Sequence, residues 1–367
     1  MKIAFWTTAS LEPRYEAVSQ EVLSLCQAFP RSWIFATNPH CIVRLLPRTR
    51  CVGLHPSFYP VMRAIVPLVE RAFHLSHVYG DMTPWLFHKT LRRRPIVHTV
   101  TQDCPTPAVE FLKRASAVVL QTRATYDRVL TLGIEPGRVH LRFPSVDLDA
   151  FTPATGTAPS VTSPRILFAT APRTAEEMLG RGVFLLLDAA AAFPELHFRL
   201  LYRTWSSGYS SLQPTRQGIA ERALGNVELT DGVVSNMAAV YRSYDFTVIP
   251  YTTPAGGKEC PNSALESLAC GVPALVSSAC TFSRFVLENR CGCVFEPTPR
   301  GLRSAVDEGL RNWKAFSCAA RAAAIEHFDA AKLLCLRDLC PTLRIGRRLA
   351  RFLELFMTLW FSSRQKS

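Results

Sequence analysis

The 367-residue sequence lacks several features that define other classes of protein. It has no apolar run of about 18 residues, the length that a membrane-spanning helix needs, and no low-complexity tract. No Cys or His pair at zinc-binding spacing accompanies Cys291 and Cys293, and a structural zinc site needs four ligands. Acidic residues are also few, with 29 Asp and Glu against 42 Lys and Arg, which gives a formal net charge of +13. This charge favours acidic partners such as nucleotide-sugar phosphates, anionic lipid or nucleic acid.

The residues that are present are typical of a globular protein. Hydrophobic residues make up 48% of the sequence and charged residues 19%, and the chain is long enough for two domains with separate cores. The twelve cysteines are scattered, many of them within apolar runs, and the chain begins with the strand-like segment Met1–Trp6 in place of a signal peptide. We therefore expect reduced, buried thiols in a cytoplasmic protein.

Strand and helix patterns alternate along most of the chain, which predicts the α/β class. Buried strands are predicted at 3–6, 95–101 and 115–121, and the pattern restarts with a strand at 165–169. Residues 152–164 are rich in Thr, Ser, Pro and Ala, which is typical of a linker. We predict a first domain over 1–153, a hinge over 154–164, a second domain over 165–327 and a C-terminal segment over 328–367.

The C-terminal segment has the composition of an interfacial helix. Four arginines between 344 and 351 precede the mostly apolar run Phe352–Phe361. Such a run suits peripheral contact with an anionic membrane, for example the inner face of the plasma membrane. Packing against the protein itself is the alternative.

A compact unit over 246–278 organises the second half of the chain. The strand Phe246–Pro250 leads through a glycine-containing loop into a helix that begins at Pro261 and is capped by Gly271, and the strand Ala274–Ser277 follows. This order puts the helix N-terminus at the carboxyl ends of the strands, where free N–H groups and the helix dipole favour a phosphate. The candidate ligand contacts in the loop and the first helical turn are Gly256, Gly257, Lys258, Pro261, Asn262 and Ser263.

Residues 261–277, PNSALESLACGVPALVS, resemble the donor-binding motif of the retaining group 1, or family four, glycosyltransferases. That motif has two glutamates with seven residues between them, then a small-residue helix and a Cys-Gly-x-Pro turn. Glu266 takes the second glutamate position and, as the resemblance implies, would hold the ribose diol of a nucleotide. Lys258 lies eight positions earlier and Glu259 one residue later, so a one-residue bulge would bring Glu259 into the first position, beside the donor sugar.

The same resemblance assigns roles to basic residues after the strand at 165–169. Arg181-Gly182 is similar to the Lys-Gly or Arg-Gly pair that contacts the diphosphate in this family, and Arg173 would supply a second guanidinium. Arg203, after the next strand, would border the nucleotide. Solvated arginines in loops are the alternative interpretation.

In the first domain, the strand at 95–101 ends at the residues expected to contact the transferred sugar or the acceptor. These are Thr101, Gln102 and Asp103, of which Thr101 and Asp103 join Glu259 as candidate catalytic residues. His98 lies inside the strand and is interpreted as a core histidine.

The resemblance implies the GT-B fold, in which two Rossmann-like domains face a central cleft. It further implies transfer of a hexosyl unit, with retention, from a UDP- or GDP-sugar to a hydroxyl of a glycan or lipid-linked acceptor, in cell-surface polysaccharide synthesis. It implies no cofactor and no bound metal. The alternatives are a non-catalytic binding or scaffold protein of the same fold, and an epimerase or phosphorylase. Nucleic-acid binding is not expected, because the basic residues are dispersed and no aromatic-basic motif is present.

Overall fold

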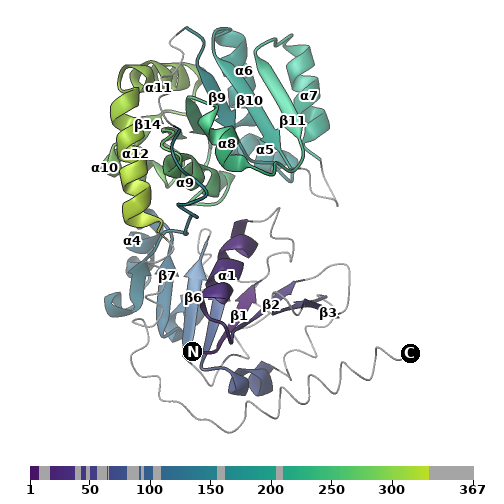
Figure 1. Cartoon of the computed structure of the whole chain (residues 1–367), viewed down its shortest axis with the longest axis vertical. Coiled ribbons are helices and arrows are strands. Elements are labelled where there is room, and N and C mark those ends of the chain that lie inside the picture. Colours follow the sequence, from purple (N-terminus) through teal and green to yellow (C-terminus); the bar gives the residue numbers. More distant parts are fainter. Residues whose placement is uncertain are drawn as a thin grey trace, which may run out of the picture. The chain divides into compact units, whose positions relative to one another are not determined.

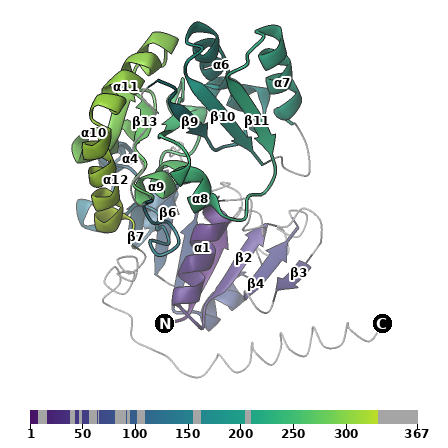
Figure 2. The same cartoon turned by 45° about the horizontal axis from the view of Figure 1, so that its top comes forward.

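The computed structural model describes residues 1–7, 17–37, 43–46, 50–55, 64, 66–80, 91, 95–101, 109–154, 162–203 and 210–329. They form two compact units, each of which can be followed in Figures 1 and 2. The first contains described residues within 1–120 and 126–141, and the second contains 121–125 and the described residues from 142 onwards. Residues 142–153, predicted in the first domain, therefore pack with the second. Most of the predicted hinge and the segment from 330 to the C-terminus lie outside the described residues.

The first unit is built on one eight-stranded sheet with the order β3-β4-β2-β1-β5-β6-β7-β8. All neighbouring strands are parallel except β3 and β4. From β1 the chain adds strands on one side, and from β5 it adds them on the other, so the topological switch point lies between β1 and β5. The strands are β1 Ile3–Thr7, β2 Trp33–Thr37, β3 Val43–Leu46, β4 Cys51–Leu54, β5 Leu75–Tyr79, β6 Ile96–Val100, β7 Ala117–Leu120 and β8 Val139–Leu141.

Alternating side chains of these strands supply two separate cores, as a sheet covered on both faces requires. In β1, Ile3 and Phe5 join the core under α1, whereas Ala4 and Trp6 join the core on the opposite face. The fully buried pattern of β1 agrees with its prediction as a buried strand. The helices of this part of the chain are α1 Ala17–Ala28, α3 Val109–Arg114 and α4 Arg123–Thr131, with short 3-10 helices η3 Glu70–Ala72 and η5 Pro136–Arg138.

The second unit has a six-stranded, all-parallel sheet with the order β11-β10-β9-β12-β13-β14. This is a doubly wound order, with its switch point between β9 and β12. The strands are β9 Arg165–Phe168, β10 His197–Tyr202, β11 Val227–Asp231, β12 Phe246–Ile249, β13 Ala274–Ser277 and β14 Gly292–Phe295.

Alternate residues of these strands again pack into separate cores on the two faces of the sheet. Phe246 and Val248 of β12 join the core that includes α6 and α11, while Ile249 and Val276 join the core that includes α9, α10 and α12. The helices are α5 Ala175–Gly180, α6 Val183–Ala192, α7 Leu212–Glu221, α8 Met237–Arg242, α9 Asn262–Ala269, α10 Ser283–Asn289, α11 Pro299–Arg311 and α12 Trp313–His327, with the 3-10 helix η6 Pro254–Gly256.

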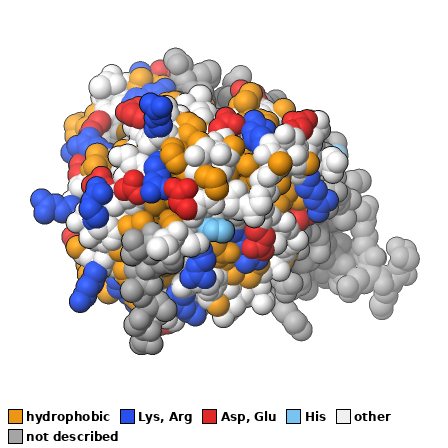
Figure 3. Space-filling view, turned by 90° about the horizontal axis from the view of Figure 1, so that it is seen from above, with side chains coloured by type: hydrophobic (Ala, Val, Ile, Leu, Met, Phe, Trp, Pro, Cys, Tyr) orange, Lys and Arg blue, Asp and Glu red, His pale blue; other side chains and the backbone are white. Residues whose placement is uncertain are grey.

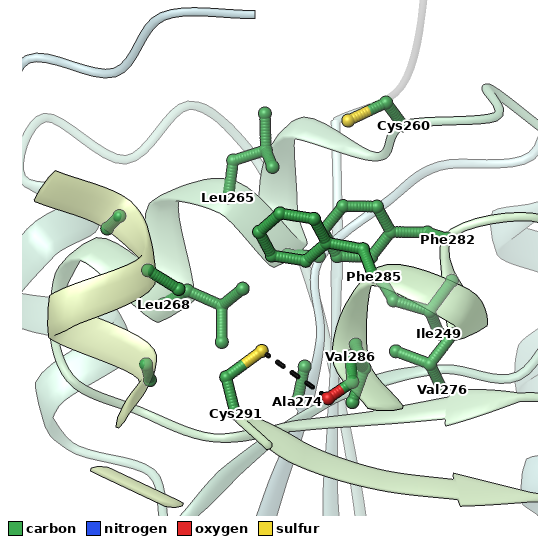
Figure 4. Packing of buried hydrophobic residues seen from close by; sticks show 14 of the residues in the cluster. Ile249, Cys260, Leu265, Leu268, Ala274, Val276, Phe282, Phe285, Val286 and Cys291 are labelled. Carbon is green, nitrogen blue, oxygen red and sulfur yellow. Dashed lines mark hydrogen bonds between the residues drawn. The ribbon is translucent and has the colours of Figure 1, made fainter. Parts of the chain in front are cut away.

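Aromatic stacking fixes α9 and α10 on the second core. The rings of Phe282 and Phe285 stack with centroids 4.8 Å apart. Figure 4 shows them between Leu265 and Leu268 of α9 and the strand residue Val276. Because all five side chains are buried, the α9 helix is anchored along its inner face, and its outer residues are held in fixed positions.

The strands predicted at 165–169, 246–250 and 274–277 are confirmed within one residue, and three elements or element ends differ from prediction. The segment 170–182 contains the helix α5, and neither α5 nor α7 had been predicted. Pro261 directly precedes α9 instead of occupying its first helical position. Gly271 adopts φ +70°, as expected of a helix-terminating glycine.

The eight cysteines among the described residues are all free, and seven of them are buried. None of the described helices has both the length and the apolar character to span a membrane. On the face drawn in Figure 3, basic side chains of the described residues are interspersed with acidic, apolar and uncharged ones.

Candidate functional site

The candidate site lies in the second unit, at the carboxyl ends of its parallel strands. The chain leaves β9 towards β10 on one side and leaves β12 towards β13 on the other. The loops after β9 and β12 therefore diverge at the switch point, which is where doubly wound sheets bind their ligands. These two loops contain most of the candidate residues predicted from the sequence.

Glu266 is held by a tyrosine from a neighbouring helix. Its carboxylate oxygen Oε2 accepts a 2.8 Å hydrogen bond from the hydroxyl of Tyr241 on α8. Glu266 is half-buried on α9, and Tyr241 is only 1% exposed. Among the described residues, Tyr241 is the one hydrogen-bond donor to this carboxylate, so the other oxygen, Oε1, remains available to a ligand.

The charge state of Glu266 is set by opposing effects. Burial raises the pKa of its carboxyl group, while the Tyr241 hydroxyl and the positive charges of Arg203 and Lys258 lower it. Burial and the adjacent carboxylate in turn raise the pKa of Tyr241 well above its usual value, so the phenol stays protonated and donates. Arg203 directly follows β10, so the connections after β9, β10 and β12 all contribute residues to the site.

The N-terminus of α9 combines several of the predicted ligand contacts. Lys258 Nζ donates to Asn262 Oδ1 at 2.7 Å, and Asn262 and Ser263 are the first two residues of α9. Pro261 precedes them with φ −69° and has no N–H group of its own. The helix dipole and the Lys258 ammonium group thus place positive charge at one point, which suits an anion.

The glycines of this region allow two loops to pack backbone to backbone. Gly182 has φ +73°, and a Cβ atom there would overlap the carbonyl oxygen of Pro250. A Cβ atom on Gly256 would likewise overlap the carbonyl oxygen of Gly180, and one on Gly257 the ring of Tyr251. The glycines therefore dock the β12–α9 loop onto the turn between α5 and α6.

Arg173 and Arg181 are brought together by one acidic residue that the sequence analysis did not identify. Glu177 on α5 forms ion pairs with Arg173 Nη2 at 3.2 Å and with Arg181 Nη2 at 3.0 Å. Arg181 Nη1 also donates to Thr170 Oγ1 at 2.5 Å, and the Arg181 side chain is 14% exposed, against 51% for Arg173. Arg181 Nε is buried and has no partner among the described residues. Arg173 is thus the more accessible cation of the pair.

Glu259 is buried, and its carboxylate is bound by two hydroxyl groups. Its Oε2 atom accepts from Thr122 Oγ1 at 2.9 Å and from Thr125 Oγ1. Both threonines lie in 121–125, the short segment that the structure groups with the second unit. The backbone carbonyl of Glu259 accepts from Thr281 Oγ1 at 3.2 Å. A contact between Glu259 and a donor sugar stays a prediction.

The structure describes only part of the candidate site in the first unit. Thr101 is buried directly after β6, whereas Gln102 and Asp103 lie outside the described residues. His98 is 2% exposed, and its Nε2 atom lies 3.4 Å from the carbonyl oxygen of Gly80. Burial lowers its pKa to about 4, which agrees with its interpretation as a neutral core histidine.

Comparisons with known proteins agree with this architecture. Residues 180–312 match the family model described as glycosyl transferases group 1, which is about a third of the chain. No curated protein matches the sequence.

Solved structures with the same fold cover nearly the whole chain. A glycosyltransferase from Rickettsia africae has a TM-score of 0.70 at 14% identity, over 93% of this chain and 99% of its own. HepE from Anabaena, in complex with UDP-glucose, has a TM-score of 0.73 at 15% identity, over 94% and 99%. A sucrose-phosphate synthase from Thermosynechococcus elongatus has a TM-score of 0.72 at 15% identity, over 92% and 98%. At these identities the likeness establishes the fold: two Rossmann-like α/β units of the GT-B type.

Proposed function

We propose that this GT-B protein is a glycosyltransferase that moves a hexosyl unit, with retention, from a UDP- or GDP-sugar to an acceptor hydroxyl. The observation that carries the proposal is the half-buried Glu266 carboxylate, fixed by Tyr241 beside the positive N-terminus of α9. It lies within the residues that match the group 1 family model. The solved complexes of HepE with UDP and UDP-glucose support a nucleotide-sugar donor.

Each part of the donor has a proposed contact in the second unit. Glu266 Oε1 accepts from the ribose hydroxyls. Lys258 and the first N–H groups of α9, at Asn262 and Ser263, face the phosphates, and Arg173 and Arg181 neutralise the diphosphate. Carboxylates and guanidinium groups select these partners by charge-assisted hydrogen bonds.

In the proposed reaction the bond between the anomeric carbon and the diphosphate oxygen breaks. The acceptor oxygen forms the new bond on the same face of the sugar, and its proton passes to the leaving diphosphate. The basic residues stabilise the negative charge that develops on the leaving diphosphate, which is an electrostatic contribution to catalysis. Glu259, Thr101 and Asp103 remain the proposed contacts for the transferred sugar and the acceptor. No resident metal or cofactor is part of this proposal.

For the acceptor, the proposal names a chemical class. We propose a glycan or a lipid-linked acceptor, used in cell-surface polysaccharide synthesis in the cytoplasm or at the inner face of the plasma membrane. The net charge of +13 supports an anionic surface or substrate as partner.

A non-catalytic binding protein of the same fold is the second candidate. It is favoured by the buried Glu259 carboxylate, whose Oε2 atom already accepts from two threonine hydroxyls. Such a protein would bind the nucleotide without turning over a donor.

A donor panel distinguishes the two candidates. UDP- and GDP-sugars are incubated with the wild-type protein and with the Glu266→Gln and Glu288→Gln variants. Nucleotide binding is measured by calorimetry, and sugar release is followed by mass spectrometry. Glu288 is an exposed glutamate on α10 that pairs with Arg284, so it is a matched control. We expect slow release from one donor, lost only in Glu266→Gln. Binding of nucleotide without any release would favour the non-catalytic candidate, and neither binding nor release would contradict both.

A further inference from the structure

Tyr241 contacts the proposed ribose-binding carboxylate, although its type and spacing gave no reason to select it. Its ring belongs to a buried cluster with side chains of β9, β10 and the α9–β13 turn, and its centroid lies 6.2 Å from that of Phe151. The phenol hydroxyl is its polar end, and among the described residues its hydrogen-bond partner is Glu266. A buried tyrosine hydroxyl needs such a partner, but the apolar packing would be satisfied equally by phenylalanine.

The helix that carries Tyr241 is itself held in place at both ends. Asn236 caps its N-terminus by accepting from the Ala239 N–H at 2.9 Å. At the other end Arg242 Nη1 donates to the carbonyl oxygen of Thr152 at 3.1 Å. The hydroxyl of Tyr241 is therefore a donor at a fixed position, since the ring cannot turn aside without opening the cluster.

Glu266 has no comparable constraint from its own packing. It is half-buried, and a glutamate side chain has three rotatable bonds. From this geometry we infer that Tyr241 is a positioning residue: by occupying Oε2 it fixes the Glu266 carboxylate with Oε1 directed to a vicinal diol. This inference rests on the proposed function and adds a residue that determines ribose recognition at the same site.

The hydrogen bond also stabilises the ionised carboxylate. The groups that face Glu266 are Tyr241 from α8, Arg203 after β10 and Lys258 before α9, and all three lower its pKa against the effect of burial. Loss of the Tyr241 hydroxyl removes one of these three favourable interactions, so the pKa of Glu266 should rise and the carboxylate should protonate at a higher pH. A protonated Glu266 can accept fewer hydrogen bonds from a diol, so ligand affinity should fall as the pH falls through this pKa.

The test is binding of UDP by calorimetry between pH 5 and 8, for wild type, Tyr241→Phe, Glu266→Gln and the control Tyr244→Phe. The hydroxyl of Tyr244, like that of Tyr241, is hydrogen-bonded to a side chain of the second unit: it accepts from Arg199 Nη1 at 3.3 Å. Tyr244 lies just before β12, at the amino end of the sheet and therefore away from the candidate site. We expect Tyr241→Phe to weaken UDP binding about ten- to a hundredfold at pH 7.5, the loss typical of one hydrogen bond to a charged group. We also expect it to move the acid midpoint of binding to a higher pH. Tyr244→Phe should change neither.

A structural role alone predicts a different result. It would lower the melting temperature of Tyr241→Phe without moving the pH midpoint, and that outcome would overturn the inference. UDP binding that is unchanged in Tyr241→Phe but lost in Glu266→Gln would also overturn it and leave the proposed function intact. Binding unchanged in Glu266→Gln itself would instead contradict the proposed role of Glu266.

Discussion

Two buried histidines make the first unit sensitive to acid. His77 on β5 and His98 on β6 are 1% and 2% exposed, and burial lowers their pKa values to about 3 and about 4. His77 Nε2 lies 2.8 Å from Thr99 Oγ1, and the Nδ1 atoms of both rings are buried without a partner among the described residues. Both rings are therefore neutral in the folded state, and neither environment can accommodate a second proton well.

The size of the effect follows from the difference between folded and unfolded pKa values. An unfolded histidine has a pKa of about 6.5, so the unfolded state binds more protons than the folded state between about pH 6.5 and pH 4. Stability is complete above pH 6.5 and is lost as the pH falls towards the folded pKa values. At about 1.4 kcal/mol per pH unit, lowering the pH from 7.5 to 5 costs about 2 kcal/mol for each histidine. The pair thus removes about 4 kcal/mol, a large part of a typical domain stability of about 5–15 kcal/mol.

Hydrogen–deuterium exchange with mass spectrometry measures this separately in the two units. With correction for the intrinsic pH dependence of exchange, peptides that cover β5 and β6 should show an opening free energy about 4 kcal/mol smaller at pH 5 than at pH 7.5. In His77→Gln, whose amide cannot titrate, the decrease should shrink by about 2 kcal/mol, and His98→Gln should behave alike. Equal decreases in wild type and both variants would refute the reasoning, whatever the absolute stability of the variants.

Three further predictions concern the second unit. Arg321 donates to three backbone carbonyl oxygens, two of them in the segment before β9, so Arg321→Ala should destabilise the unit by about 2–4 kcal/mol in urea unfolding, with Arg321→Lys between it and wild type. Gly182→Ala combines a positive φ with overlap of a carbonyl oxygen and should lower the melting temperature by more than about 5 °C; an unchanged melting temperature would contradict the described packing. Thr125→Val removes a hydroxyl donor from the buried Glu259 carboxylate and should cost about 1–3 kcal/mol, whereas Thr125→Ser should restore most of it.

The segment around α9 could be predicted almost residue by residue because its signals are local. Pro261 and Gly271 mark the two ends of the helix, leucines and small residues fill its inner face, and the apolar strand at 274–277 follows a tight turn. The helix α5, which was not predicted, also had a local signal. Thr174 accepts from the N–H of Glu177, which is the Thr-x-x-Glu pattern of a capped helix start.

The helix α7 is a different case, because its sequence argues against a helix. Gly218 is a poor helix former and lies in its interior, whereas Pro214 lies in the first turn, where proline is tolerated. A Cβ atom on Gly218 would press on Leu187 of α6, so the glycine permits close packing that stabilises the helix despite its low propensity. Tertiary contact decided the structure here, and no window of the sequence contains that information.

The hydrogen-bond partners of the candidate site residues could not be predicted from the sequence either. Tyr241 meets Glu266 across 25 positions, and Thr122 meets Glu259 across 137. Each pair joins separate loops or helices, so spacing along the chain says nothing about the contact. The sequence could therefore indicate Glu266 as a candidate ligand, but not which of its oxygens is already occupied.

The most direct test of the account is the recognition of the ribose diol by Glu266. Affinities of UDP and 2′,3′-dideoxy-UDP are measured by calorimetry for wild type and Glu266→Gln, which forms a double-mutant cycle between protein and ligand. We predict that wild type binds UDP at least about tenfold more tightly than the dideoxy analogue, and that Glu266→Gln loses most of this preference. A preference for UDP that is equally large in wild type and Glu266→Gln would contradict the account, because the diol would then be held by other residues.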